Sequence, residues 1–167
     1  PRSTSFESVI YTFQSSSEGV KAQNCLSDGK YCSFPVTGAN GRAVLFEALS
    51  QQCIRDSNPY LFIDYLALFE QCEPMFSETC SAQIASKLGI NRRQISECVN
   101  NTFVGGSDDI YKTDNNVLKG QLAKALQLNS NSYPALFINN ILYKGSPVFK
   151  DVYLTICALV SEDIEAC

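Results

Sequence analysis

The stretch NSYPALFINNILYKG, residues 131–145, decides the fold of this 167-residue chain. Pro134 stands directly before an apolar run, although proline cannot donate a hydrogen bond to a strand ladder. Asn139-Asn140 separates that run from a second one, and asparagine tolerates the positive φ angles of a two-residue turn. The stretch therefore predicts a β-hairpin with a proline at its entry.

Apolar residues recur at helical spacing in a long block upstream of the hairpin and in one segment downstream of it. Ser77 and Asn91 stand at N-cap positions, Asn58-Pro59 separates two helices, and Gly89 marks a C-terminus. The predicted helices cover residues 42–54, 60–72, 78–89, 92–100, 113–128 and 148–160.

The N-terminal part differs in character from this helical block. Residues 6–14, FESVIYTFQ, are rich in β-branched and aromatic side chains and predict a strand. Residues 20–40 contain Gly29, Pro35 and Gly38, and we expect a loop there. The predicted order is therefore strand, helical block, hairpin, helix.

That order is typical of a layered α/β domain in which a helical insertion separates a strand from an antiparallel hairpin. A proline just before the first hairpin strand of such a domain is a candidate for a cis peptide bond. Tyr133-Pro134 is thus a candidate for the cis-proline of a thioredoxin-like fold.

Eight cysteines and no histidine are the clearest feature of the composition. A zinc site would require CxxC pairs or a mixture of cysteine and histidine, and neither occurs, so we expect no metal. Paired disulfides in an oxidising compartment explain the even number better. The cysteines are Cys25, Cys32, Cys53, Cys72, Cys80, Cys98, Cys157 and Cys167.

Other features agree with such a compartment and exclude several function classes. Asn100-Asn101-Thr102 is a sequon for N-glycosylation at Asn100. A formal net charge of −4 argues against a nucleic-acid partner, whose footprint is basic. The lack of histidine excludes a Ser-His-Asp arrangement within the chain. No sequence motif calls for a cofactor.

Several motifs, in their order, resemble a known family. They are GKYC at residues 29–32, cysteine-terminated helical segments, and PALFIN at 134–139 continued by YKG at 143–145. This series is similar to the central luminal domain of vacuolar sorting receptors, over roughly residues 8–167. The resemblance implies a thioredoxin-like fold and cargo recognition in the lumen of the secretory pathway (Golgi, endosome or vacuole) or outside the cell.

The chain departs from the family pattern at two points. It has no tryptophan, and Phe62 and Tyr65 stand near the place where the family has tryptophans in the second helix. The family's first strand-helix unit would also lie before residue 1. We therefore expect one domain over 1–167, the C-terminal part of a thioredoxin-like domain in a larger protein. Another segment of that protein is expected to cover the exposed sheet edge.

Disulfide connectivity follows from locality only as a hypothesis, since eight cysteines allow 105 pairings. Short loops favour Cys25–Cys32 and Cys72–Cys80. Cys157–Cys167 would tie the last helix to the tail, which leaves Cys53–Cys98 to join two helices.

Three functions remain open from the sequence. The first is a non-catalytic binding domain that holds protein or peptide cargo by strand addition at Tyr133, Pro134 and Ala135. In this reading the chain would reach a membrane only through a segment outside it. The second is a thiol-disulfide oxidoreductase with reactive cysteines upstream, because no CxxC pair occurs here. The third is an extracellular structural or assembly subunit that reuses the fold.

Overall fold

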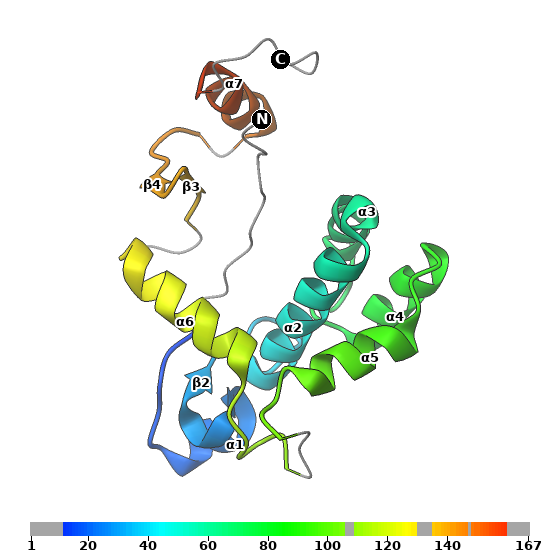
Figure 1. The fold of residues 1–167 in the computed structure, drawn as a ribbon, viewed down its shortest axis with the longest axis vertical. Helices are drawn as coiled ribbons and strands as arrows, with labels where there is room; N and C mark the ends of the chain where they lie inside the picture. The colour runs from blue at the N-terminus through cyan, green and yellow to red at the C-terminus, as the bar shows by residue number, and fades with distance from the viewer. Residues whose placement is uncertain (1–11, 106–108, 130–134, 147, 160–167) are drawn as a thin grey trace. The chain divides into compact units, whose positions relative to one another are not determined.

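The computed structural model describes residues 12–105, 109–129, 135–146 and 148–159. The chain divides into an N-terminal unit, Pro1–Ala125, and a C-terminal unit, Leu126–Cys167. Figure 1 shows the elements in chain order, and each unit is treated by itself below.

The N-terminal unit contains most of the helices. Its elements are α1 (Glu18–Asn24), β1 (Cys25–Leu26), the 3-10 turn η1 (Ser27–Gly29), β2 (Tyr31–Cys32), α2 (Gly41–Ser57), α3 (Pro59–Phe69), α4 (Glu78–Lys87), α5 (Arg92–Asn101) and most of α6 (Asn116–Leu128). The C-terminal unit contains β3 (Phe137–Ile138), β4 (Ile141–Leu142) and α7 (Phe149–Leu159).

The structure confirms the predicted class, a mixed α/β chain with a helical block between the N-terminal extended segment and the hairpin. Of the predicted strand at 6–14, only its end lies within the described residues, where Phe13 forms an antiparallel bridge with Cys32. The strands that the structure describes form two separate two-stranded antiparallel sheets, β1–β2 and β3–β4.

Local capping determines where several helices begin, as the sequence predicts. Cys80 N–H donates to Ser77 Oγ at 3.3 Å, and Gln94 N–H donates to Asn91 Oδ1 at 3.3 Å. Gly89 follows α4 with a φ of 70°, the left-handed conformation that often ends a helix. The cap predictions at these helix ends are thus confirmed.

The predicted loop over residues 20–40 is wrong in part, because α1 and the β1–β2 ladder occupy its first half. The α1 helix has only seven residues, too few to show a clear apolar periodicity. Contacts from a distant residue stabilise its C-terminal end, since Arg42 Nη2 donates to Lys21 O at 2.9 Å. Tertiary contacts therefore stabilise a helix that local sequence does not predict.

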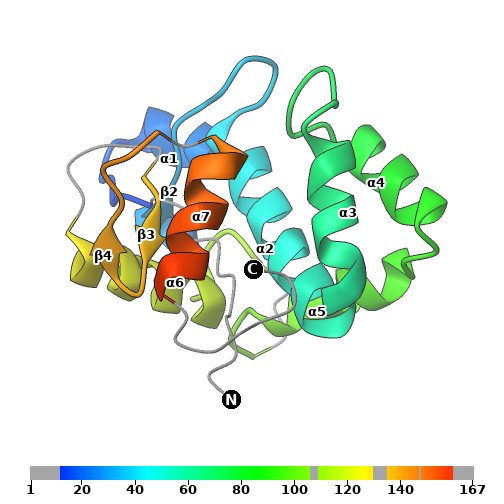
Figure 2. The same ribbon diagram turned by 90° about the horizontal axis from the view of Figure 1, so that it is seen from above.

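The hydrophobic core of the N-terminal unit is built around α2. This helix contacts α1, β1, β2, α3, α4 and α5, and Figures 1 and 2 both show it beside α3 and α5. Leu45, Leu49 and Cys53 are buried on it, as their i, i+4, i+8 spacing predicts. Phe62 and Tyr65 of α3 are buried as well, so these aromatic residues belong to the core.

A buried polar cluster joins three helices of this core. The Tyr65 hydroxyl of α3 donates to Glu47 Oε1 of α2 at 2.7 Å and lies 2.7 Å from Ser81 Oγ of α4. Gln51 Nε2 donates to the same carboxylate at 3.0 Å. Burial raises the pKa of Glu47 despite these donors. The cluster fixes the helices while keeping a carboxyl group in the interior.

Three disulfides lie within the N-terminal unit: Cys25–Cys32, Cys53–Cys98 and Cys72–Cys80. They agree with the connectivity hypothesis, in which locality favours Cys25–Cys32 and Cys72–Cys80 and elimination leaves Cys53–Cys98. Cys53–Cys98 joins α2 to α5 across a sequence separation of 45 residues. Cys157 is also disulfide-bonded. Its expected partner, Cys167, lies outside the described residues, so that pairing stays a prediction.

Removing the long-range disulfide should destabilise the chain more than removing a local one. The chain-entropy model gives about 4 kcal/mol for Cys53–Cys98 and about 2.5 kcal/mol for Cys72–Cys80, because the former closes the longer loop. Denaturant unfolding of Cys53→Ala/Cys98→Ala and of Cys72→Ala/Cys80→Ala measures both losses. An equal or larger loss in the second variant would contradict this ranking.

The substitution Glu47→Gln should change how stability depends on pH. A raised pKa means that the fold prefers the protonated carboxyl, so the unfolding free energy of the wild type falls as pH rises from about 4.5 through the raised pKa. Glutamine has no ionisation step, so the variant should lack this fall and be relatively more stable at pH 8. Urea unfolding of both chains between pH 4 and 8 measures how the unfolding free energy depends on pH. The exposed Glu97→Gln is the matched control, and parallel curves for wild type and Glu47→Gln would refute the assignment.

Candidate protein-binding site

The residues predicted to bind a partner lie at the start of the C-terminal hairpin. Tyr133 and Pro134 lie outside the described residues, so the cis geometry of their peptide bond stays a prediction. Ala135 is half-buried and leads through Leu136 into β3. The structure therefore describes the hairpin that follows the predicted site and one of the three predicted residues.

The hairpin has the register and the turn that the sequence predicts. Phe137 pairs with Leu142 and Ile138 with Ile141, which leaves Asn139 and Asn140 as the turn. Their φ angles are 52° and 64°, the positive values of a tight hairpin turn.

This register determines which backbone groups point outward from β3. Tyr143 N–H donates to Leu136 O at 2.8 Å, so Leu136 and Tyr143 form a hydrogen-bonded pair. Hydrogen-bonded and non-hydrogen-bonded pairs alternate along an antiparallel ladder. Phe137 and Leu142 are then a non-hydrogen-bonded pair, and the N–H and C=O groups of Phe137 point away from β4. An extended peptide can pair with such groups.

Apolar side chains are also exposed on the hairpin, mainly on β4. Ile141 is 72% exposed and Leu142 36% exposed, while Phe137 and Ile138 are half-buried. Exposed apolar side chains on a short strand pair are a feature of strand-addition surfaces, where main-chain hydrogen bonds give affinity and side chains give specificity. The hairpin therefore combines backbone donors and acceptors with an apolar surface.

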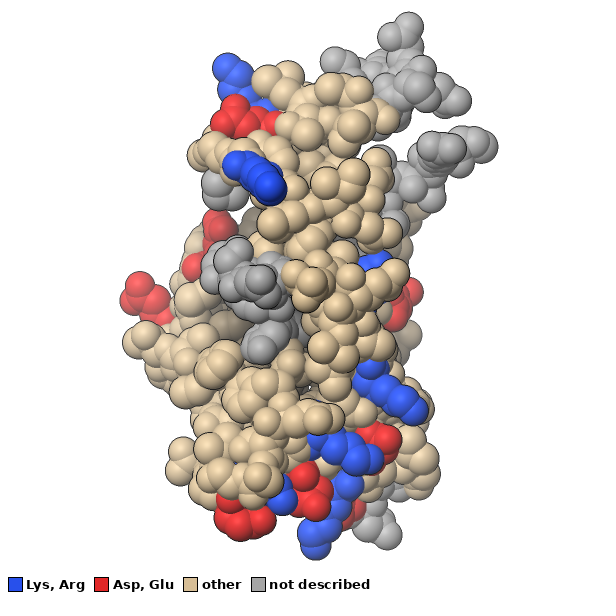
Figure 3. Space-filling model, turned by 90° about the vertical axis from the view of Figure 1, so that its left-hand side faces the viewer, with Lys and Arg blue, Asp and Glu red and all other residues tan. Residues whose placement is uncertain are grey.

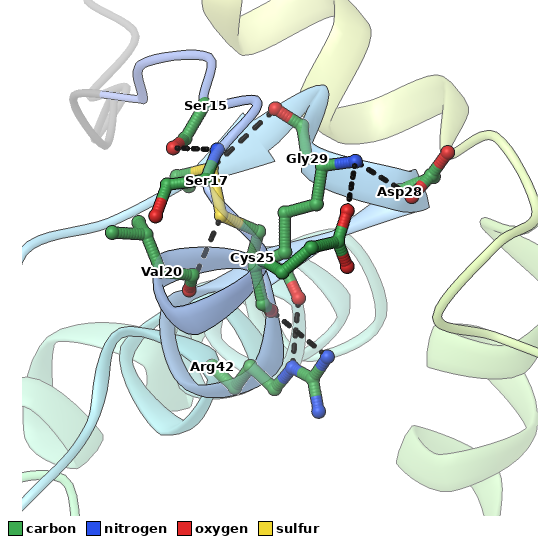
Figure 4. A network of polar contacts seen from close by, with 10 residues as sticks. Ser15, Ser17, Val20, Cys25, Asp28, Gly29 and Arg42 are labelled. Atoms are coloured by element: carbon green, nitrogen blue, oxygen red, sulfur yellow. Dashed lines mark hydrogen bonds and ion pairs between the residues drawn. A yellow bond between two sulfur atoms is a disulfide. The ribbon is translucent and has the colours of Figure 1, made fainter.

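The other chemically notable region has a structural role. It consists of the Cys25–Cys32 disulfide loop and the Arg42 side chain, and is here called the clamp. Figure 4 shows the Arg42 side chain directed at the carbonyl of Cys25, to which Arg42 Nε donates at 2.8 Å. The Arg42 guanidinium also lies 4.2 Å from the centre of the Tyr111 ring. Both cysteines are almost fully buried, so the disulfide is closed to a protein substrate.

The same clamp holds the segment that leads into α6. Ser27 Oγ donates to Thr113 O at 2.7 Å, and the Tyr31 hydroxyl donates to Asp114 Oδ1 at 2.7 Å. Lys30 Nζ lies 3.4 Å from Asp114 Oδ2. The Tyr31 hydrogen bond is the main cause of a lowered pKa at Asp114, and Lys30 adds to it. Burial is the main cause of a raised pKa at Tyr31, and the Asp114 carboxylate adds to it.

Charges around the clamp neutralise one another. Figure 3 shows acidic and basic side chains mixed in the part of the N-terminal unit where α1 and β2 lie in Figure 1. Lys21 Nζ, for example, lies 3.2 Å from both Glu18 and Asp28 carboxylate oxygens. Such a mixed surface offers no single sign of charge to steer a ligand.

The described part of the chain shows neither a cluster suited to a metal ion nor a helix that could cross a membrane. The candidate glycosylation residue Asn100 is exposed in the last turn of α5. Thr102 of the same sequon is buried, with its hydroxyl donating to Val99 O at 2.6 Å and accepting from Asn115 Nδ2 at 2.7 Å. Glycosylation at Asn100 stays a prediction.

Removing the Tyr31 hydroxyl should raise the pKa of Asp114 and destabilise the fold at neutral pH. A lowered pKa contributes stability that is present above the unfolded value and lost as pH falls through the folded value. We expect Tyr31→Phe to cost about 1.5 kcal/mol at pH 7 and less in acid. Carbon-detected NMR titration of Asp114 and denaturant unfolding measure both effects.

Lys30→Ala provides the comparison, because the ammonium group is a lesser cause of the shift and is half exposed. It should move the Asp114 pKa less than Tyr31→Phe does. A larger shift in Lys30→Ala would show that the ion pair, and not the hydroxyl, controls this carboxylate.

The curated relatives agree with the family resemblance found in the sequence. The chain is 27% identical over 161 residues to vacuolar-sorting receptor 5 of Arabidopsis thaliana, a match that covers 84% of this chain and 25% of the relative. It is 26% identical over 159 residues to vacuolar-sorting receptor 4 of the same plant, covering 84% and 24%. The chain thus spans about a quarter of the length of these relatives.

A family model extends this agreement over almost the whole chain. Residues 3–157 match the vacuolar sorting receptor thioredoxin-like domain, which includes residues of both units. The match confirms the thioredoxin-like assignment and the resemblance drawn from the hairpin and the cysteines. The chain belongs to the family of vacuolar sorting receptor thioredoxin-like domains.

Proposed function

We propose that this chain is a non-catalytic luminal domain of a sorting-receptor-like membrane protein and takes part in recognising protein cargo. Its partners would be a cargo peptide or other segments of the same parent protein, and membrane attachment would come from a segment outside this chain. Membership of a receptor family supports this role, since the named relatives are vacuolar-sorting receptors. The compartment would be the lumen of the secretory pathway.

The observation that carries the proposal is that backbone groups of β3 point away from β4, close in sequence to the predicted binding residues. Phe137 presents its backbone N–H and C=O away from β4, two residues after Ala135. An extended cargo segment that aligns with β3 would form main-chain hydrogen bonds there. Residues Tyr133, Pro134 and Ala135 would contact the same segment at the strand entry.

The cysteine arrangement supports binding over thiol exchange. Cys25, Cys32, Cys53 and Cys72 are buried and paired within the N-terminal unit. Exchange requires an accessible thiolate. The sequence also has no CxxC pair.

Peptide binding with backbone-modified ligands tests strand addition directly. Short peptides tiled across vacuolar proteins would be screened by fluorescence anisotropy, and the best binder remade with N-methyl groups on alternate amides. One methylated set should lose binding about tenfold or more, because its N–H groups face β3, and the other should bind nearly unchanged. Equal behaviour of the two sets would rule out strand pairing.

A pair of chain variants locates the site on the hairpin. Ile141→Asp should weaken the same peptide about tenfold, because Ile141 pairs with Ile138 of β3 and a charge there would lie on the apolar face that the two side chains share. Leu154→Asp on α7 is the matched control, since Leu154 is 53% exposed in the same unit. Loss of binding in the control alone would move the site to α7 and contradict the proposal.

A further inference from the structure

Helix α3 of the N-terminal unit is apolar on two opposite faces. Phe62, Tyr65 and Phe69 are buried on one side, where α3 packs against α2 and α4. One residue of this helix is charged, and none is basic. An ordinary surface helix would carry charged and polar residues on the side that faces water.

The exposed side of α3 is a defined surface, here called the α3 outer face. It consists of Tyr60, Ile63, Asp64 and Ala67, with Glu70 just after the helix. The first four residues follow the i, i+3, i+4, i+7 spacing and therefore share one helix face. Tyr60 is 93% exposed and Ile63 is 58% exposed. An exposed aromatic beside an aliphatic side chain is typical of interface centres.

The stretch of chain that contains this face carries only acidic charges. From residue 56 to residue 86 the chain contains no lysine or arginine. Arg55, just before this stretch, forms an ion pair with Asp56 at 3.4 Å, and Lys87 stands at the C-terminal end of α4. The acidic residues of the stretch are Asp56, Asp64, Glu70, Glu73 and Glu78.

We propose that the α3 outer face binds a segment of a partner protein that presents lysine or arginine side chains together with aliphatic or aromatic ones. Tyr60 and Ile63 would contact the apolar side chains of the partner. Asp64 and Glu70 would attract its basic groups, which adds specificity and speeds association.

Charge also argues against other occupants. In a symmetric pair of chains the same acidic surface meets itself, so Asp64 and Glu70 of one copy would approach the acidic groups of the other and repel them. Nucleic acid and anionic membrane surfaces would be repelled in the same way. A basic apolar segment satisfies both features of the face at once. The α3 outer face lies in the N-terminal unit, whereas the hairpin lies in the C-terminal unit.

A pair of synthetic peptides tests the proposal. One is an amphipathic lysine-leucine helix, and the other has every lysine replaced by glutamate. The full chain should bind the basic peptide, more weakly at high salt, and should not bind the acidic one. Calorimetry gives the affinities, and amide NMR shifts should change at residues 60–70.

Variants then distinguish binding at the α3 outer face from general attraction of a basic peptide to an acidic chain. Tyr60→Ser/Ile63→Ser should weaken the basic peptide about tenfold or more, and Asp64→Asn several-fold. Val104→Ser and Glu97→Gln are controls for an exposed apolar side chain and an exposed acid elsewhere, and should leave the affinity unchanged. Ile141→Asp should also leave it unchanged, so failure here and failure of the hairpin proposal are distinguishable.

Three results would overturn the inference. The first is equal weakening by the face variants and the controls, which would mean attraction by net charge alone. The second is a dimer of the wild-type chain that Ile63→Ser dissociates, which would assign the face to a second copy. The third is a large loss of unfolding free energy in Tyr60→Ser/Ile63→Ser, which would mean that another part of this chain already covers the face.

Discussion

The Cys25–Cys32 disulfide is the constraint on which the N-terminal unit depends. It closes a short loop across a sequence separation of seven, whose backbone bridges to Phe13 and whose side chains hold the segment before α6. Arg42, in the first turn of α2, connects the same loop to the central helix. Gly41 is required at this junction, because a Cβ there would collide with the backbone oxygen of Ser33. One short covalent loop therefore fixes α1, α2 and the start of α6 together.

This arrangement explains how a domain with little sheet can present stable surfaces. The disulfides and the Glu47–Tyr65–Ser81 cluster hold the helices from the inside. The groups proposed to bind partners are then on the outside, at the backbone of Phe137 and on the α3 outer face. For a domain of the sorting receptor family, this arrangement would let interior contacts supply stability while exposed groups supply binding.

Local signals made parts of this fold predictable. Ser77, Asn91 and Asn139-Asn140 act on their immediate neighbours, and the structure confirms all of them. The α1 helix and the Glu47 cluster depend on contacts between residues far apart in the sequence, so no local pattern predicts them. The α3 outer face was missed for a related reason. Its apolar residues continue the hydrophobic pattern of the core, and burial alone separates Ile63 from Phe62.

Amide hydrogen exchange at Phe137 tests the central claim that the hairpin edge receives a cargo peptide. Its N–H points away from β4 and should exchange rapidly in the free chain. When a bound peptide pairs with β3, this exchange should slow by about tenfold or more, while the N–H of Tyr143, already bonded to Leu136, should change little. Unchanged exchange at Phe137 in a saturated complex would contradict the account.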